Sequence, residues 1–187
     1  MARRNDKRTR LVESADKLFH EQGVSTTTLA NIAQLADVPL GNVYYYFKSK
    51  ESIVLAVIEY RRRELQTRFE EFNTQPDVKS RLRSLIEMFV NKGEEMANHG
   101  DAFGSLCQEL GKAGGHIAEA SSELMKDILG WCEKQFTALG KTDKAHQLAV
   151  NLVSAIQGTC LLTLTFKDPQ YIAKHSSYLN IWLDESV

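Results

Sequence analysis

The segment that decides the fold is residues 29–47, LANIAQLADVPLGNVYYYF. Its apolar side chains recur at helical spacing from Leu29 to Ala36. Pro39 then disfavours helical backbone at Val38 but fits the first turn of a new helix. The segment therefore predicts two short helices joined by a tight turn, which is a helix-turn-helix.

The side-chain types inside this motif suit two packed helices with one exposed face. Ala33 is small at the expected close approach of the helices, and Asp37 stands in the turn, where Asp tolerates left-handed backbone better than most residues. Side chains expected to pack beneath the turn are Ile32, Ala36, Val38, Val43 and Tyr46. The exposed face combines a small residue with amide and phenol groups that can hydrogen-bond phosphates or base edges. Its residues are Leu40, Gly41, Asn42, Tyr44 and Tyr45, and two lysines flank it, Lys48 and Lys50.

Helical periodicity continues through the rest of the 187 residues, with only three prolines and eleven glycines. This pattern excludes a disordered, collagen-like or turn-rich β protein. We expect an all-α protein of about nine helices, and Gly23 should end the first one in a left-handed cap. The helices are expected near residues 7–22, 29–36, 39–47, 49–73, 78–97, 103–110, 124–140, 144–166 and 171–183.

The near-neutral net charge of −1 conceals two unlike halves. Through Arg68 the chain has 12 Lys and Arg against 8 Asp and Glu, and after it 11 against 16. The start of the chain is basic, with Arg3, Arg4, Lys7, Arg8 and Arg10. Such a segment suits a polyanion such as the DNA backbone, although an ordinary solvated terminus has the same composition.

The compartment follows from what the sequence lacks. The start has no apolar core of the signal-peptide kind, and no apolar run approaches the roughly 18–20 residues of a membrane span. Cys107, Cys132 and Cys160 are too widely spaced for a disulfide framework or a paired-cysteine zinc site. We expect a cytoplasmic protein with reduced thiols and no membrane partner.

The runs TTLANIA (residues 27–33) and ADVPLGNVYYYFKSKE (residues 36–51) closely resemble the DNA-binding domain of the tetracycline-repressor (TetR) family. The resemblance covers about the first quarter of the chain. It implies a DNA-binding domain at residues 1–50 with the motif at 29–48, and a ligand-binding and dimerisation domain at 51–187. The helix at residues 49–73 would link the two.

The resemblance also implies a homodimer whose third helices enter successive major grooves of a pseudo-palindromic operator. By position, the residues that resemble operator contacts are Leu40, Gly41, Asn42, Tyr44 and Tyr45, with Thr27, Thr28, Tyr46, Lys48 and Lys50 at or near phosphates. Core packing is the alternative for Tyr46 and Phe47, and Leu40 has the alternative of covering the helix start. The basic start has a further possible role in minor-groove or phosphate contacts.

Dimerisation is implied through the last two helices. Independently, residues 144–166 are apolar over too much of the helix circumference for one contact, and Gly158 would permit close approach. A central helix in a monomeric bundle is the alternative.

The resemblance further implies an effector pocket, and the apolar and aromatic residues available for it suit a hydrophobic small molecule. The candidate lining residues are Phe89, Met96, Phe103, Leu106, Cys107, Leu110, Trp131 and Gln157. Plain core is the alternative for each. A cluster of acidic and histidine residues matches no metal motif, and scattered surface polar residues are its alternative; no cofactor is expected. These residues are Glu94, Glu95, His99, Asp101 and His116.

Three alternative functions differ in how well the sequence supports them. Cys107 lies beside glycine-rich breaks and makes a thiol-based sensor of electrophiles or oxidants conceivable. An enzyme lacks support, because no catalytic triad order, phosphate-cradling glycine loop or paired metal ligands are present. A nonspecific DNA protein would be basic throughout. The sequence predicts a non-enzymatic, ligand-responsive transcriptional regulator, and the resemblance implies a repressor.

Overall fold

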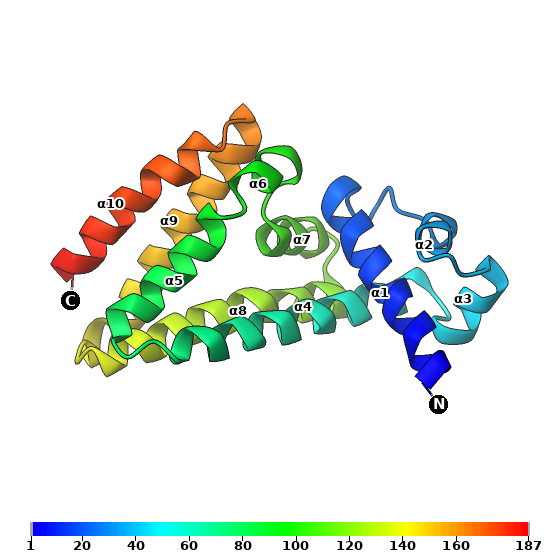
Figure 1. The fold of residues 1–187 in the computed structure, drawn as a ribbon, viewed down its shortest axis with the longest axis horizontal. Helices are drawn as coiled ribbons and strands as arrows, with labels where there is room; N and C mark the ends of the chain where they lie inside the picture. The colour runs from blue at the N-terminus through cyan, green and yellow to red at the C-terminus, as the bar shows by residue number, and fades with distance from the viewer. Residues whose placement is uncertain (1, 187) are drawn as a thin grey trace. The chain divides into compact units, whose positions relative to one another are not determined.

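The computed structural model describes residues 2–186, and the side chains of residues 6–186. This part of the chain forms ten α-helices and one 3-10 turn and has no strand (Figure 1). The all-α prediction is confirmed. The helices are α1 (Ala2–Gln22), α2 (Leu29–Leu35), α3 (Leu40–Tyr46), α4 (Lys50–Asn73), α5 (Val78–Val90), α6 (Gly93–His99), α7 (Ala102–Gly111), α8 (Gly115–Ala138), α9 (Ala145–Phe166) and α10 (Gln170–Ser186), with the 3-10 turn at Thr142–Lys144.

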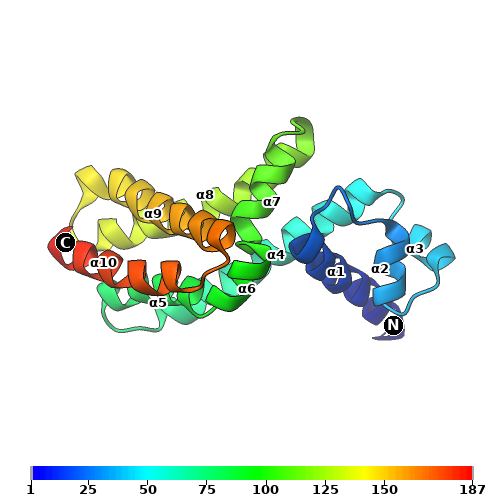
Figure 2. The ribbon, with the colours of Figure 1, turned by 90° about the horizontal axis from the view of Figure 1, so that it is seen from above.

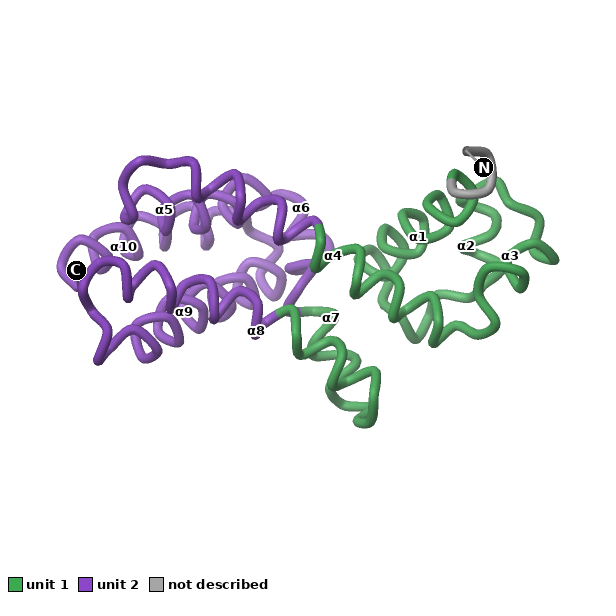
Figure 3. The backbone as a smooth tube through the Cα atoms, turned by 90° about the horizontal axis from the view of Figure 1, so that it is seen from below, with its two compact units in different colours: residues 1–63, 105–124 green, residues 64–104, 125–187 purple. Residues whose placement is uncertain are grey.

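The chain divides into two compact units (Figure 3). Unit 1 comprises residues 1–63 and 105–124, and unit 2 comprises residues 64–104 and 125–187. The long helices α4 and α8 and the short α7 therefore each contribute to both units. The functional boundary at residue 50 stays a prediction.

Unit 1 is built around the packing of α1 on α2 and of α2 on α3. Leu11 of α1, Ile32 of α2 and Ile53 of α4 are fully buried in it. Gly23 ends α1 with a φ of 86°, and its N–H donates to the carbonyl of Phe19 at 3.1 Å. The predicted left-handed cap is confirmed, since this φ favours glycine.

Unit 2 is a helical bundle in which α10 lies beside α5 and α9, and α6 lies beside α9 (Figure 1 and Figure 2). Its core is continuous and apolar, with Phe136, Leu82 and Leu152 fully buried. Phe69 of α4 stacks on Trp131 of α8 with ring centroids 4.8 Å apart. Burial of such large apolar surfaces is the main source of stability here.

One helix expected at residues 78–97 is two helices, α5 and α6, separated at Asn91 and Lys92. A Cβ on Gly93 would lie 3.3 Å from Ile172 Cγ2 and 3.4 Å from Pro169 Cβ. The absence of a side chain at Gly93 lets α6 begin close against the start of α10. Apolar spacing on both sides of this break is similar, so periodicity alone did not reveal it.

Among the described residues, α9 is the most apolar helix. The expectation that no apolar run approaches the length of a membrane span was wrong for this segment. The segment Thr142–Phe166 is long and apolar enough to cross a membrane by length and composition. One face of α9 is buried within unit 2, including Leu152 and Ile156. Leu161, Leu162 and Phe166 are exposed, at 53%, 43% and 56%. The helix thus has a second apolar face besides the one it buries.

Candidate nucleic-acid interface

The helix α2 begins at a reciprocal cap. The N–H of Asn31 donates to Thr28 Oγ1 at 3.1 Å, and the N–H of Thr28 donates to Asn31 Oδ1 at 2.9 Å. Two backbone N–H groups at the helix start are thereby satisfied. This arrangement stabilises a helix of only seven residues, which would otherwise be marginal.

The turn between α2 and α3 has the predicted backbone. Asp37 has a φ of 51°, in the left-handed region, and the N–H of Val38 donates to the carbonyl of Ala33 at 3.0 Å. Pro39 precedes the first residue of α3, and the carbonyl of Pro39 accepts from the N–H of Asn42 at 2.8 Å. The helix-turn-helix is therefore present at the residues that predicted it.

The predicted packing side chains lie in the core of unit 1. Ile32 and Val43 are fully buried, and Ala33, Ala36 and Val38 are each 4% exposed. Tyr46 is half-buried, and its ring makes an edge contact with Tyr45 at 5.1 Å between centroids. Phe47 is buried, with the guanidinium of Arg8 at 5.3 Å from its ring centroid. Phe47 thus has the core role that was its alternative.

The opposite face of α3 is exposed as a group. Leu40, Tyr44 and Tyr45 are 42%, 48% and 55% exposed, and Gly41 and Asn42 are also exposed. A Cβ on Gly41 would meet no atom within 4 Å, so this part of α3 leaves its backbone open to close approach. Large side chains with phenol and amide groups stay in water here, although burial would be favourable for their apolar parts. We name these five residues the reading surface.

Of the five residues predicted to lie at or near DNA phosphates, the four other than Tyr46 differ in how far their side chains are exposed. Thr27 is fully buried, and its hydroxyl donates to the carbonyl of Gly23 at 2.7 Å, which gives this side chain a structural role. Lys50 is half-buried, and its ammonium donates to the carbonyl of Ser25 at 3.2 Å. Thr28 and Lys48 are exposed beside the reading surface.

The basic start is helical from Ala2 onward, within α1. The side chains of Arg3 and Arg4 lie outside the described residues. Arg10 lies 3.7 Å from Asp6 and 4.0 Å from Asp37, with part of its side chain exposed. Arg8 and Arg10 therefore contact groups of unit 1, and a role for the start in DNA binding stays a prediction.

The candidate effector residues divide between the two units. Phe89, Met96 and Trp131 belong to the buried core of unit 2, with Phe103 packed against it. The Trp131 indole N–H donates to Asn73 Oδ1 at 3.3 Å. In unit 1, Leu106 and Leu110 are buried and Cys107 is half-buried.

A buried polar cluster accompanies Gln157, the one polar member of that set. Asp101 is 8% exposed, and its Oδ2 accepts from the N–H of Gly104 at 2.6 Å and from Gln157 Nε2 at 3.1 Å. A Cβ on Gly104 would collide with Gln157 Oε1, so any other residue at this position would force the Gln157 side chain to move. Asp101 appeared in the sequence only among residues that match no metal motif, because its partner Gln157 on α9 is 56 residues away. Among the described residues no group of three or more His, Cys, Asp or Glu is arranged to hold a metal ion.

The cysteines show little sign of reactivity. The Cys107 thiol is half-buried and donates to the carbonyl of Ser121 at 3.0 Å. Burial raises the pKa of Cys132 to about 12, and burial with the nearby Asp101 charge raises the pKa of Cys160 further. The thiol-sensor alternative is therefore not favoured.

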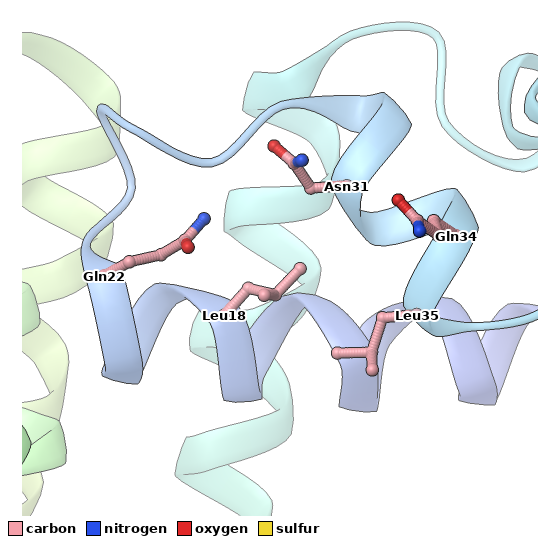
Figure 4. Close-up of a pocket in the computed structure, with 5 residues that line it drawn as sticks. All are labelled: Leu18, Gln22, Asn31, Gln34 and Leu35. Carbon is pink, nitrogen blue, oxygen red and sulfur yellow. The ribbon is translucent and has the colours of Figure 1, made fainter.

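A surface hollow of about 420 Å³ lies between α1 and α2 in unit 1 (Figure 4). Its lining mixes apolar and amide side chains: Leu18, Gln22, Asn31, Gln34 and Leu35. Two further hollows lie on α8 and around the start of α10, and neither contains a predicted effector residue. The effector site stays a prediction.

Together, the capped helix-turn-helix and its exposed reading surface define a helical protein with an N-terminal DNA-binding domain. The family model "Bacterial regulatory proteins, tetR family" matches residues 11–57. The regulator TtgR of Pseudomonas putida is 40% identical over 52 residues, which cover 28% of this chain and 25% of that relative. The chain thus matches about a quarter of the length of that relative.

Solved structures extend the similarity in fold to nearly the whole chain. SCO4454, a TetR-family transcriptional regulator from Streptomyces coelicolor, matches with a TM-score of 0.86 at 18% identity, covering 98% of this chain and 96% of that one. The regulator FadR from Bacillus subtilis, solved in complex with stearoyl-CoA, matches with a TM-score of 0.73 at 18% identity, covering 94% and 96%. Residues 11–57 thus match the TetR family of bacterial regulatory proteins, and nearly the whole chain shares the fold of solved TetR-family regulators.

Proposed function

We propose that this protein is a cytoplasmic, dimeric, ligand-responsive repressor that binds a pseudo-palindromic DNA operator. The observation that carries the proposal is the reading surface. Its phenol and amide groups stand in water on the short helix α3, whose opposite face packs into the core of unit 1 through Val43. Exposure of these large side chains does not stabilise the folded chain, and such exposed groups mark a surface that binds a partner.

The reading surface supplies the chemistry for DNA recognition. Asn42 offers the amide pair that hydrogen-bonds adenine, and Tyr44 and Tyr45 offer hydroxyls for phosphates or base edges. Gly41 lets the backbone approach the groove closely. Thr28 and Lys48, exposed at the edge, suit phosphates, and each neutralised phosphate adds to the salt dependence of binding.

A second copy of this chain is the proposed partner of the exposed face on α9 and α10. Among the described residues, every large exposed apolar side chain falls either on α2 and α3 or on these two helices. The α9–α10 group comprises Leu161, Leu162, Phe166, Tyr171, Tyr178 and Ile181, all within unit 2. A symmetric dimer would bury the same face of both copies and would present two reading surfaces to one duplex.

The effector is proposed to be an apolar small molecule. FadR, which has the same fold, binds stearoyl-CoA, and this supports a site for a molecule with a large apolar part. The predicted lining residues are almost all apolar or aromatic, with Gln157 and Asp101 as nearby polar groups. Effector binding would favour a conformer in which α4 tilts and the two reading surfaces no longer match successive grooves. A coupling free energy of about 1–3 kcal/mol suffices for such a shift.

Operator binding is tested with a duplex selected by the wild-type protein from a random-sequence library. Asn42→Ala and Tyr45→Ala should each weaken binding roughly tenfold or more in fluorescence anisotropy, because a base contact is lost in both half-sites. Gln66→Ala, which alters an exposed amide on α4, should bind like the wild type. Equal affinity of all four proteins, or an affinity that does not fall with added salt, would refute the proposal.

Dimerisation is tested by replacing Phe166, which is 56% exposed on α9, with Asp. Sedimentation should then show a monomer with unchanged helical content, because a buried carboxylate in an apolar interface is strongly unfavourable. Lys134→Asp, on an exposed lysine of α8 outside the proposed interface, should remain as dimeric as the wild type. A wild-type protein that sediments as a monomer at micromolar concentration would contradict the dimer.

A further inference from the structure

The carboxylate of Glu109 on α7 binds the backbone of the loop between α1 and α2. The N–H of Val24 donates to Glu109 Oε2 at 2.8 Å, and the N–H of Ser25 donates to Oε1 at 2.7 Å. Both partners lie more than 80 residues away in the chain, and all three residues belong to unit 1. Two charge-assisted bonds in one carboxylate define both its position and its orientation.

The loop is shaped to receive this carboxylate. Gly23, with a φ of 86°, turns the chain at the end of α1, and a Cβ there would lie 3.2 Å from Glu109 Oε2. Burial would raise the pKa of Glu109, but the hydrogen bonds from Val24 and Ser25 and the charge of Lys50 outweigh it and lower that pKa. At neutral pH, Glu109 is therefore ionised when it accepts the two hydrogen bonds from the loop.

The same loop is held from its other side and leads directly into α2. Lys50, the first residue of α4, donates to the carbonyl of Ser25 at 3.2 Å. The buried Thr27 donates to the carbonyl of Gly23 at 2.7 Å, and Thr28 caps α2. Little freedom remains between Glu109 and the first turn of α2, because each intervening residue is fixed by a hydrogen bond or by burial.

The helix α7 begins in the neighbourhood of the proposed effector residues. Asp101 precedes α7, accepts from the N–H of Gly104 and binds Gln157 of α9 within unit 2. Phe103, Leu106, Cys107 and Leu110, four of the candidate effector residues, are on α7 itself. Glu109 is one and a half turns beyond Gly104 on this continuous helix.

We infer that Glu109 is a positioning residue that makes the placement of the reading surface depend on the placement of α7. The inference rests on the proposed function and names the group that connects effector binding to the DNA-binding helices. A displacement of α7 moves the carboxylate, and the two loop N–H groups follow it or lose their partner. Either outcome changes the entry into α2.

The test begins with Glu109→Gln, which keeps the shape but replaces one acceptor oxygen by an amide donor. Amide hydrogen exchange at Val24 and Ser25 should accelerate roughly tenfold or more, as expected when charge-assisted bonds are lost. Affinity for the duplex selected by the wild type should fall roughly tenfold. Glu119→Gln, which removes the same charge from an exposed position in unit 1, should change neither value.

A second variant separates positioning from general loss of stability. Gly104→Ala should displace the Gln157 amide from Asp101 at the start of α7, because the new Cβ collides with Gln157 Oε1, and it should thereby change operator affinity severalfold. In a Glu109→Gln background the Gly104→Ala substitution should have no further effect on operator affinity. Independent, multiplicative effects of the two substitutions would overturn the inference.

The outcome is interpretable even if one variant fails to fold. In the wild-type protein, the N–H groups of Val24 and Ser25 should exchange slowly, and fast exchange at both would overturn the inference without any variant. A wild-type protein that selects no duplex would refute the proposed function. Normal operator binding together with unchanged affinity in Glu109→Gln would refute the positioning role alone.

Discussion

Replacement of Arg61 by methionine should lower the free energy of unfolding of unit 1 by about 2 kcal/mol. The Arg61 side chain on α4 is 5% exposed, with Nε at 2.5 Å from Asp16 Oδ1 and Nη2 at 3.4 Å from the Asp16 carbonyl. Removing one partner of a fully buried ion pair costs roughly 3–5 kcal/mol. Because the Asp16 side chain is 28% exposed, water can solvate the carboxylate that remains, and the cost falls toward that of one hydrogen bond to a charged group, roughly 1.5–3 kcal/mol.

Urea unfolding followed by circular dichroism measures this difference. Arg63→Met is the matched control, since Arg63 lies 3.8 Å from Glu59 with both side chains more than half exposed, and it should cost no more than about 0.5 kcal/mol. Asp16→Asn and the double variant complete a mutant cycle, in which we expect a coupling free energy of about 1–2 kcal/mol. If Arg61→Met is no less stable than Arg63→Met, or if the two single effects add, the ion pair does not hold α1 to α4.

Four further predictions follow from individual contacts. Thr28→Ala should destabilise the fold by about 1 kcal/mol through loss of the α2 cap and Thr28→Ser should not, so equal unfolding of both variants would contradict the cap. Iodoacetamide should leave Cys132 unmodified in the native protein at neutral pH, because burial raises its pKa to about 12, and rapid native alkylation would show an accessible thiol. Treatment with N-ethylmaleimide should release wild type and Cys107→Ser equally from DNA, whereas release of the wild type alone would restore the thiol-sensor hypothesis. The lowered pKa of Glu109 stabilises the fold above the pKa of the unfolded chain, and this contribution is lost as the pH falls through the folded pKa; the stability difference from Glu109→Gln should therefore vanish in acid, and a pH-independent difference would be evidence against it.

Local spacing was sufficient to predict the helix-turn-helix. Ile32 and Val43 fall where a packed pair of helices needs apolar side chains, and both are fully buried. Asp37 was assigned left-handed backbone because few other non-glycine residues tolerate it, and its φ is 51°. Such predictions succeed because each depends on residues within a few turns of one another.

Contacts between distant residues were not predictable in the same way. Glu109 binds backbone N–H groups, which every residue except proline carries, so no side-chain pattern marks its partners. Asp101 and Gln157 are 56 residues apart, and neither has an unusual neighbour in the sequence. Periodicity identified Phe89, Met96 and Trp131 as inward-facing residues, but the same spacing serves a packed core and a ligand cavity.

The most direct test of the regulatory account is the selection of duplexes from a random-sequence library by the wild-type protein. The account predicts enrichment of one inverted repeat, with half-site centres about 10 base pairs or a multiple of that apart, bound by a dimer. It also predicts that protein carrying Tyr45→Ala does not enrich this repeat. Enrichment of no sequence, or of an asymmetric site bound by a single chain, would contradict the claim that two copies of the α3 surface read one operator.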